Sequence, residues 1–185
     1  MDTPPAARNL LNKLPRWAWV AGGVAVLVLL GVLAWWLWKR RGRMDIVATA
    51  RTYVGVITSY SEAHYDDHTA DCSEYLRRVL GYASKHHDGE WWGTDNIYDD
   101  AMFAQTEWAR LSADEVTPGD IAVYPGATIN GKHHSGHVAI VTDPVTHTII
   151  DCSSSQNGVH EHVDLLAHFW TRPDAIFARF IGTAA

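Results

Sequence analysis

The chain has 185 residues, of which 47% are hydrophobic and 19% are charged, a composition that fits one globular domain with an appendage and excludes an intrinsically disordered protein. Residues 1–43 hold seven of the 15 Lys and Arg and one of the 21 Asp and Glu, a net charge of +6. Residues 44–185 hold the remaining eight basic and 20 acidic residues, a net charge of −12 that repels phosphate backbones, so we expect no nucleic-acid partner.

The first predicted element is a transmembrane helix at residues 17–38, preceded by a short arm at residues 1–16. The segment from Trp17 to Trp38 holds 22 residues without a charge, and about 20 such residues cross a bilayer as a helix. Tryptophans at both ends suit the two membrane interfaces. Because basic residues follow the segment, instead of the small residues of a cleavage site, we expect a retained anchor with a basic linker at residues 39–44.

The charges that flank the span say little about its orientation. Three Lys and Arg precede the span and four follow it closely. The positive-inside rule therefore favours a cytoplasmic carboxy-terminal domain by a single residue. The function of the domain is a stronger guide to its location.

Residues 45–185 are predicted to form one α+β domain. Apolar residues at helical spacing begin it at residues 44–56, and DCSEYLRRVLG from Asp71 is predicted to be a second helix. Later segments bounded by Gly, Pro or Asp are typical of strands: TPGDIAVYPG from Thr117, GHVAIVTD from Gly136, HTIIDCSS from His147 and AIFARFIG from Ala175. Helices first and an antiparallel sheet afterwards are typical of an α+β fold.

Cys72 occupies the first turn of the second predicted helix. If Asp71 is the N-cap, its carboxylate accepts the backbone N–H of Glu74 while the Glu74 side chain reaches back, which forms a capping box. The unpaired N–H groups and the positive end of the helix dipole favour an anion there, so they stabilise a Cys72 thiolate. The alternative is that Cys72 is simply a small, buried apolar residue.

A hairpin is predicted to bring a histidine and an aspartate together. His137 opens the strand GHVAIVTD, and the strand HTIIDCSS follows a turn at TDPVTH. If the hairpin is centred on Pro144, His137 lies directly opposite Asp151, whose carboxylate can then accept the imidazole Nδ1–H. A slip of one residue would put Cys152 opposite instead. In the predicted register Cys152 faces away, so we do not expect a disulfide between Cys72 and Cys152.

Four segments, DCSEYLRRVL, PGDIAVYPG, GHVAIVTD and IIDCSSS, resemble in order and texture the NlpC/P60 cell-wall peptidases, which share a papain-like core with the CHAP amidases. The resemblance covers about residues 45–182. It implies that Cys72 is the nucleophile, that His137 is the base and that Asp151 orients the histidine, at a position where His is commoner in that family.

The sequence departs from the family pattern in two places. Glu74 replaces the glycine of the DCSG turn, and RTYVGVITSYSEAHYDD stands where the family has a YxWGG segment. The residues that contact substrate are therefore less well defined than the catalytic ones. The candidates are Tyr53, Tyr60, Ser73, Trp91 and Trp92, although the two tryptophans could instead pack beneath a long loop.

The 11 histidines all lie in the acidic domain, and some are spaced so that they could bind zinc. These are the pairs His64 with His68 and His160 with His162, and the group His133, His134 and His137. No HExxH motif or CxxC pair accompanies them. We therefore expect neither a metal nor any other cofactor.

The resemblance implies a peptidoglycan hydrolase that cleaves an amide bond in the stem peptides of the cell wall, and the predicted span at residues 17–38 would anchor it to the membrane. Its substrate requires the domain to lie in the periplasm, on a single-pass protein of the inner membrane. Local remodelling of the wall around an envelope-spanning secretion machine would suit such an enzyme, as would phage lysis. The alternatives are a cytoplasmic-facing thiol hydrolase acting on a protein or lipid, and a catalytically inactive module that binds wall peptides.

Overall fold

The computed structural model describes residues 26–34, 46–81, 93–164 and 168–182. The chain divides into two compact units, Met1–Gly42 and Arg43–Ala185. In the first unit, residues 26–34 form a helix whose side chains are exposed, and the rest of the predicted span lies outside the described residues. Within the described ranges, none of the helices combines the length and apolar character that crossing a bilayer requires.

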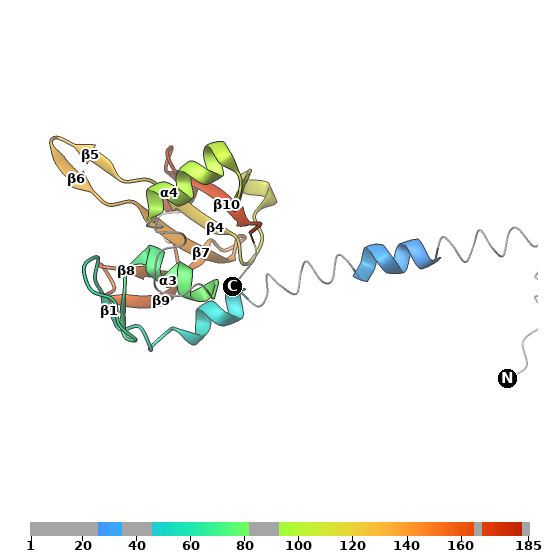
Figure 1. Ribbon diagram of the computed structural model, residues 1–185, viewed down its shortest axis with the longest axis horizontal. Coiled ribbons are helices and arrows are strands. Elements are labelled where there is room, and N and C mark those ends of the chain that lie inside the picture. The colour runs from blue at the N-terminus through green and yellow to red at the C-terminus, as the bar shows by residue number, and fades with distance from the viewer. Residues whose placement is uncertain (1–25, 35–45, 82–92, 165–167, 183–185) are drawn as a thin grey trace, which may run out of the picture. The chain divides into compact units, whose positions relative to one another are not determined.

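The second unit is built on a six-stranded antiparallel sheet (Figure 1), which confirms the predicted α+β class with its antiparallel sheet. The strand order is β3, β10, β4, β7, β8, β9. The predicted strand segments form four of these strands, namely β4 (Ile121–Tyr124), β7 (His137–Asp143), β8 (Thr148–Ser153) and β10 (Ile176–Phe180). The two edge strands, β3 (Trp108–Leu111) and β9 (Gly158–Val163), were not predicted.

Short helices and two small strand pairs make up the rest of the domain in the residues that the structure describes. The helical segments are residues 46–52, α3 (Cys72–Val79), α4 (Thr94–Asp99), the π-helical turn η1 (Asp100–Ala104), the 3-10 turn η2 (Ala113–Glu115) and α5 (His168–Thr171). A parallel pair joins β1 (Ser59–Tyr60) to β2 (Thr69–Ala70), and an antiparallel pair joins β5 (Ala127–Ile129) to β6 (Lys132–His134). The β5–β6 hairpin projects from the body of the domain (Figure 1).

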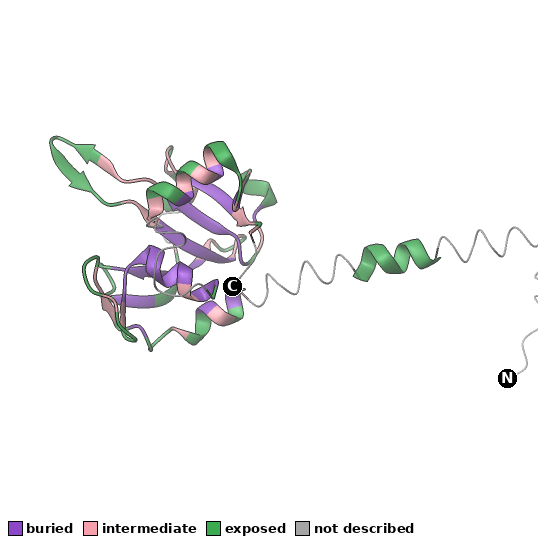
Figure 2. Cartoon of the chain, in the orientation of Figure 1, coloured by how far each residue is buried: buried purple, intermediate pink, exposed green. Residues whose placement is uncertain are grey.

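The central strands are buried on both faces, as Figure 2 shows. Helix α3 packs against β7 and β8, where Tyr75 and Leu76 join a cluster that includes Val138 and Ile140 of β7. The alternate β7 residues contribute to a second cluster, which contains Phe169 of α5. The strand is therefore fixed from both sides, and so is the side chain at its start.

The register of the β7–β8 hairpin differs from the prediction by two residues. Ile140 pairs with Ile150 and Val141 with Ile149, a register that places Asp151 opposite Ala139 instead of opposite His137. The hairpin turn is longer than a turn centred on Pro144, because its closing pair is Asp143 with Thr148. A shift of two residues leaves a side chain on the same face of the sheet, so Asp151 still shares a face with His137.

An irregularity between Val141 and Asp143 makes this arrangement possible. If the register of the closing pair, Asp143 with Thr148, continued unbroken along both strands, Asp151 would lie opposite Ile140. Its carboxylate would then point toward α3. The extra residue, Thr142, works as a β-bulge that moves the register by one and returns Asp151 to the face of His137. The bulge thus directs the side chain that the candidate site needs.

Candidate active site

The start of helix α3 is held by its N-cap. The Asp71 Oδ1 atom accepts the backbone N–H of Glu74 at 2.7 Å, as predicted, and also the Ser73 hydroxyl at 2.8 Å. Its Oδ2 atom accepts the Tyr65 hydroxyl at 2.6 Å. Both carboxylate oxygens are therefore engaged, and they fix the turn that presents Cys72. Ser73, a predicted substrate contact, is buried here with its hydroxyl on Asp71.

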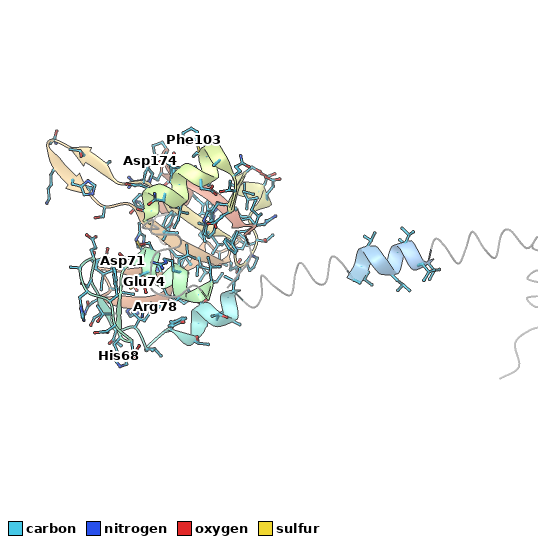
Figure 3. All side chains as sticks on the ribbon, viewed as in Figure 1. His68, Asp71, Glu74, Arg78, Phe103 and Asp174 are labelled. Carbon is cyan, nitrogen blue, oxygen red and sulfur yellow. The ribbon has the colours of Figure 1, made fainter. Side chains whose placement is uncertain are left out.

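The other half of the predicted capping box, in which the Glu74 side chain would reach back to the N-cap, is replaced by ion pairs. The Glu74 carboxylate pairs with Arg78 at 2.8 Å and with Arg77 at 3.5 Å, and its side chain is 3% exposed. Arg78 also donates to the backbone oxygens of Asp66 and Thr69 at 2.8 and 3.3 Å. The buried charges fasten the segment before the helix to the helix itself, on the side where Figure 3 labels Asp71, Glu74 and Arg78.

His137 stands at the first position of β7 with its imidazole held on both sides. Its Nε2 atom lies 2.7 Å from the Asp151 Oδ2 atom, and its ring stacks on Phe169 at 5.9 Å between centroids with an angle of 25°. We expected the carboxylate to bind Nδ1, so that detail is wrong. Asp151 thus occupies Nε2, and the Cys72 side chain interacts electrostatically with the same ring.

A glycine allows β7 to begin at this place. A Cβ on Gly136 would lie 2.6 Å from the Tyr124 carbonyl oxygen and 2.8 Å from the Gly126 nitrogen. The Gly126 N–H in turn donates to Asp95 at 2.7 Å. A side chain at position 136 would therefore separate the strand from its neighbour and displace His137, which explains physically why glycine precedes the histidine in GHVAIVTD.

The surroundings of His137 favour its protonated form. Burial by itself lowers the pKa of His137, but the hydrogen bonds with Asp151 and Cys72 outweigh burial and raise that pKa to about 10. The side chain is 17% exposed, so water screens these interactions only in part. An imidazolium beside the sulfur is the partner that a thiolate needs.

Asp151 supports two histidines at once. Its Oδ2 atom binds His137, and its Oδ1 atom lies 3.1 Å from the Nε2 atom of His162 on β9. Burial raises the pKa of Asp151, but the hydrogen bonds from the two imidazoles prevail and lower it to about 2. The carboxylate is therefore charged at every pH at which the protein would work.

A cleft of about 530 Å³ opens over this face. Its walls include His137, Asp151, His162 and Tyr60, one of the predicted substrate contacts. Cys72 is 4% exposed and is not among the residues that line the cleft, whereas His137 is.

The other predicted substrate contacts lie elsewhere. Tyr53 packs edge-on against Tyr75 with ring centroids 6.0 Å apart, and it belongs to the margin of the core rather than to the cleft wall. Trp91 and Trp92 lie outside the described residues. Across the parts of the chain that the structure describes, no three His, Cys, Asp or Glu residues are grouped so that they could hold a metal ion.

The second cysteine is distinct from the first. Both cysteines are free, and Cys152 is fully buried with its thiol donating to the Ala70 backbone oxygen at 3.2 Å. Burial, followed by the electrostatic interactions with Cys72 and Asp151, raises the pKa of Cys152 to about 12. Cys152 is therefore an inert core thiol.

Sequence reasoning missed three contributors to the site. Tyr124 and Phe169 pack near the His137 ring, at 6.1 and 5.9 Å between centroids, and His162 binds Asp151. The alternation in GVHEHV is the signal that could have revealed β9. Because this segment follows β8 through a short turn, the two strands pair, and His160 and His162 then lie on the face of Asp151.

No protein-family model matches the chain, and no curated protein matches it at a significant level. Among solved structures, NlpC1 from Trichomonas vaginalis is similar with 16% identity and a TM-score of 0.44, over 71% of this chain and 41% of that one. The chain spans less than half the length of NlpC1 and of NlpC2 from the same organism.

In two other solved structures, the match to this chain extends over almost the whole of the other protein. The NlpC/p60 domain of the peptidoglycan hydrolase SagA is 22% identical with a TM-score of 0.40, over 74% of this chain and 96% of that one. An N-acetylmuramoyl-L-alanine amidase from Bacteroides uniformis is 12% identical with a TM-score of 0.48, over 77% of this chain and 100% of that one. At TM-scores below 0.5 these are resemblances, and nothing about the chemistry of this chain follows from them.

The charges of the site predict a pH window of stability. Asp151 has a folded pKa of about 2, below its unfolded value of about 3.9, so its contribution is present above about pH 4 and is lost as the pH falls toward 2. His137 has a folded pKa of about 10, above its unfolded value of about 6.5, so its contribution is complete below about pH 6.5 and is lost as the pH rises toward 10.

We therefore expect the wild-type protein to exceed the Asp151→Asn variant in free energy of unfolding by the largest margin between about pH 4 and 6.5. Urea unfolding followed by tryptophan fluorescence at pH 3, 5.5 and 9 measures that margin. A margin that stays the same at all three values would contradict the charged pair.

Proposed function

We propose that this protein is a membrane-anchored peptidoglycan hydrolase that cleaves an amide bond of the stem peptide with Cys72, His137 and Asp151. The observation that carries the proposal is the His137 ring 2.7 Å from the buried Asp151 carboxylate, a ring that also interacts electrostatically with Cys72 at the start of α3. The four motif segments that resemble NlpC/P60 peptidases support the choice of substrate.

In the first half of the reaction, the Cys72 thiolate attacks the carbonyl carbon of the amide. The bond to sulfur forms as the carbonyl π electrons move to oxygen. The backbone N–H of Cys72, at the first position of α3, is one donor for that oxyanion, and the loss of one such donor in another enzyme costs about 2.7 to 4 kcal/mol of barrier. The protonated His137 then gives its Nδ1 proton to the leaving nitrogen, which departs as an amine and leaves a thioester.

In the second half, His137 removes a proton from water, and the oxygen of that water attacks the thioester carbonyl. The carbon–sulfur bond breaks, the acid is released and the thiolate is restored beside the imidazolium. Asp151 accepts the Nε2–H throughout. It keeps Nδ1 aimed at the sulfur and supports the positive charge of the ring without taking its proton.

The anchor proposed at residues 17–38 would confine hydrolysis to wall within reach of the membrane. This suits local remodelling around an envelope-spanning secretion machine, with the domain in the periplasm. The carboxy-terminal flank has one basic residue more than the other, which by itself favours the opposite orientation. The requirement of a wall substrate is the stronger argument, and it favours the periplasm.

Replacement of the nucleophile tests the reaction. The Cys72→Ala variant should release no soluble muropeptides from purified peptidoglycan, because loss of the nucleophile in a serine protease lowers kcat by about 10⁶-fold. The matched control is Cys152→Ala, which removes the other thiol and should still hydrolyse the wall. Mass spectrometry of the products also identifies the bond. Equal product release by the Cys72→Ala and wild-type proteins would exclude the proposed nucleophile.

A topology reporter tests the location. Alkaline phosphatase, which is active only outside the cytoplasm, should be active when it is fused after Ala185 of the full chain in a bacterial host. The control is the same fusion to a chain without residues 1–43, which should be inactive. An inactive full-length fusion that accumulates normally would favour a cytoplasmic thiol hydrolase over a wall enzyme.

A further inference from the structure

His162 contacts the carboxylate of Asp151 on the oxygen that His137 leaves open. It lies on β9, where Ile149 is its direct partner and Asp151 is the diagonal neighbour on the same face. Its Nε2 atom is 3.1 Å from Oδ1 of Asp151, while His137 is 2.7 Å from Oδ2. Each oxygen of the buried carboxylate therefore has its own imidazole.

Both ring nitrogens of His162 face atoms that can only accept a hydrogen bond. Nε2 faces the Asp151 carboxylate at 3.1 Å, and Nδ1 lies 3.2 Å from the backbone oxygen of Val163. A neutral imidazole has one N–H and can satisfy only one of these acceptors, whereas an imidazolium satisfies both. The geometry thus favours a charged His162, with 29% of its side chain exposed.

The electrostatic surroundings act in the same direction. The hydrogen bond with Asp151 raises the pKa of His162 more than partial burial lowers it, and the charge of nearby Asp164 raises it further. The titratable groups around His162 are Asp151 from β8, His160 on the same face of β9, Asp164 after β9 and, beyond Asp151, His137 from β7. Glu62 and His168 line the same cleft.

We propose that His162 is a positioning residue which, as an imidazolium, aligns the Asp151 carboxylate and moderates the negative charge that Asp151 presents to His137. This inference rests on the proposed function, because its role is exerted through the two residues that would carry the reaction. His162 bonds no reacting atom in this account. It acts on His137 only through Asp151.

Two separable effects follow from this role. Loss of the hydrogen bond frees Oδ1 of Asp151, so the carboxylate can turn and the His137 ring loses its alignment, which lowers kcat. Loss of the positive charge alone leaves more of the Asp151 charge to support the His137 imidazolium. The ring then holds its proton to higher pH, and the alkaline limb of the activity profile moves upward.

The test compares full-length wild-type, His162→Ala and His162→Gln proteins on a soluble muropeptide from pH 5 to pH 10. His162→Ala should lower kcat about 10- to 100-fold with little change in KM, as removal of outer hydrogen-bond partners of metal-ligating histidines lowers activity. His162→Gln keeps a donor toward Asp151 and should recover most of kcat, with the alkaline limb of kcat/KM displaced to higher pH. The matched control is His64→Ala, an exposed histidine that does not line the cleft, which should change neither.

Three results would overturn the proposal. If kcat and the pH profile of His162→Ala equal those of the wild type, His162 has no role in the site. If only KM rises, His162 contacts substrate instead. If thermal stability falls while the kcat of the folded protein is unchanged, its role is structural alone.

A measurement that needs no activity separates this inference from the proposed hydrolysis. The ring nitrogens of His137 can be titrated by NMR in wild-type and His162→Gln proteins, and the His137 pKa should be higher in the variant. If the wild-type protein hydrolyses no muropeptide but this difference is present, the hydrolase proposal fails and the coupling stands. Equal titration curves would refute the coupling.

Discussion

The carboxylate of Asp151 between two imidazoles is the interaction on which the rest of the site depends. A carboxylate with a 6% exposed side chain is costly to bury unless partners satisfy both of its oxygens. His137 and His162 provide those partners from the strands on either side. The same contacts fix the His137 ring and favour its protonated form. The stability of the buried charge and the alignment of the base therefore have one physical origin.

The fold presents this group from rigid elements. The thiol stands at the start of a helix whose N-cap, Asp71, has both carboxylate oxygens hydrogen-bonded. The imidazole stands at the start of a strand preceded by Gly136, which is too confined for a side chain. The carboxylate lies on the next strand, directed by a bulge at Thr142. The core packs against each of these elements, so little conformational entropy remains to be lost when a substrate binds. A membrane anchor would then determine only where the chemistry takes place.

The sequence predicted most of this arrangement, and its failures have identifiable causes. Motif residues at element starts, such as Cys72 after Asp71 and His137 after Gly136, were located because capping and strand signals are local. The pairing of His137 directly opposite Asp151 was wrong, because turn length and a bulge are set by tertiary packing. The error spanned two residues, so the face was still right. His162 was missed because its role exists only once β9 pairs with β8.

Alkylation of the native full-length protein with iodoacetamide at pH 5.5, followed by mass-spectrometric mapping of the modified cysteines, tests the central claim most directly. If the Cys72 thiol is paired with the imidazolium of His137, it should be modified at this pH. Cys152 should stay unmodified until the protein is unfolded. The opposite result is a Cys72 that resists the reagent at pH 5.5 and reacts only as the pH approaches about 8.5, as an ordinary thiol does. That outcome would mean that the thiol and the imidazole do not form the pair on which the hydrolase depends.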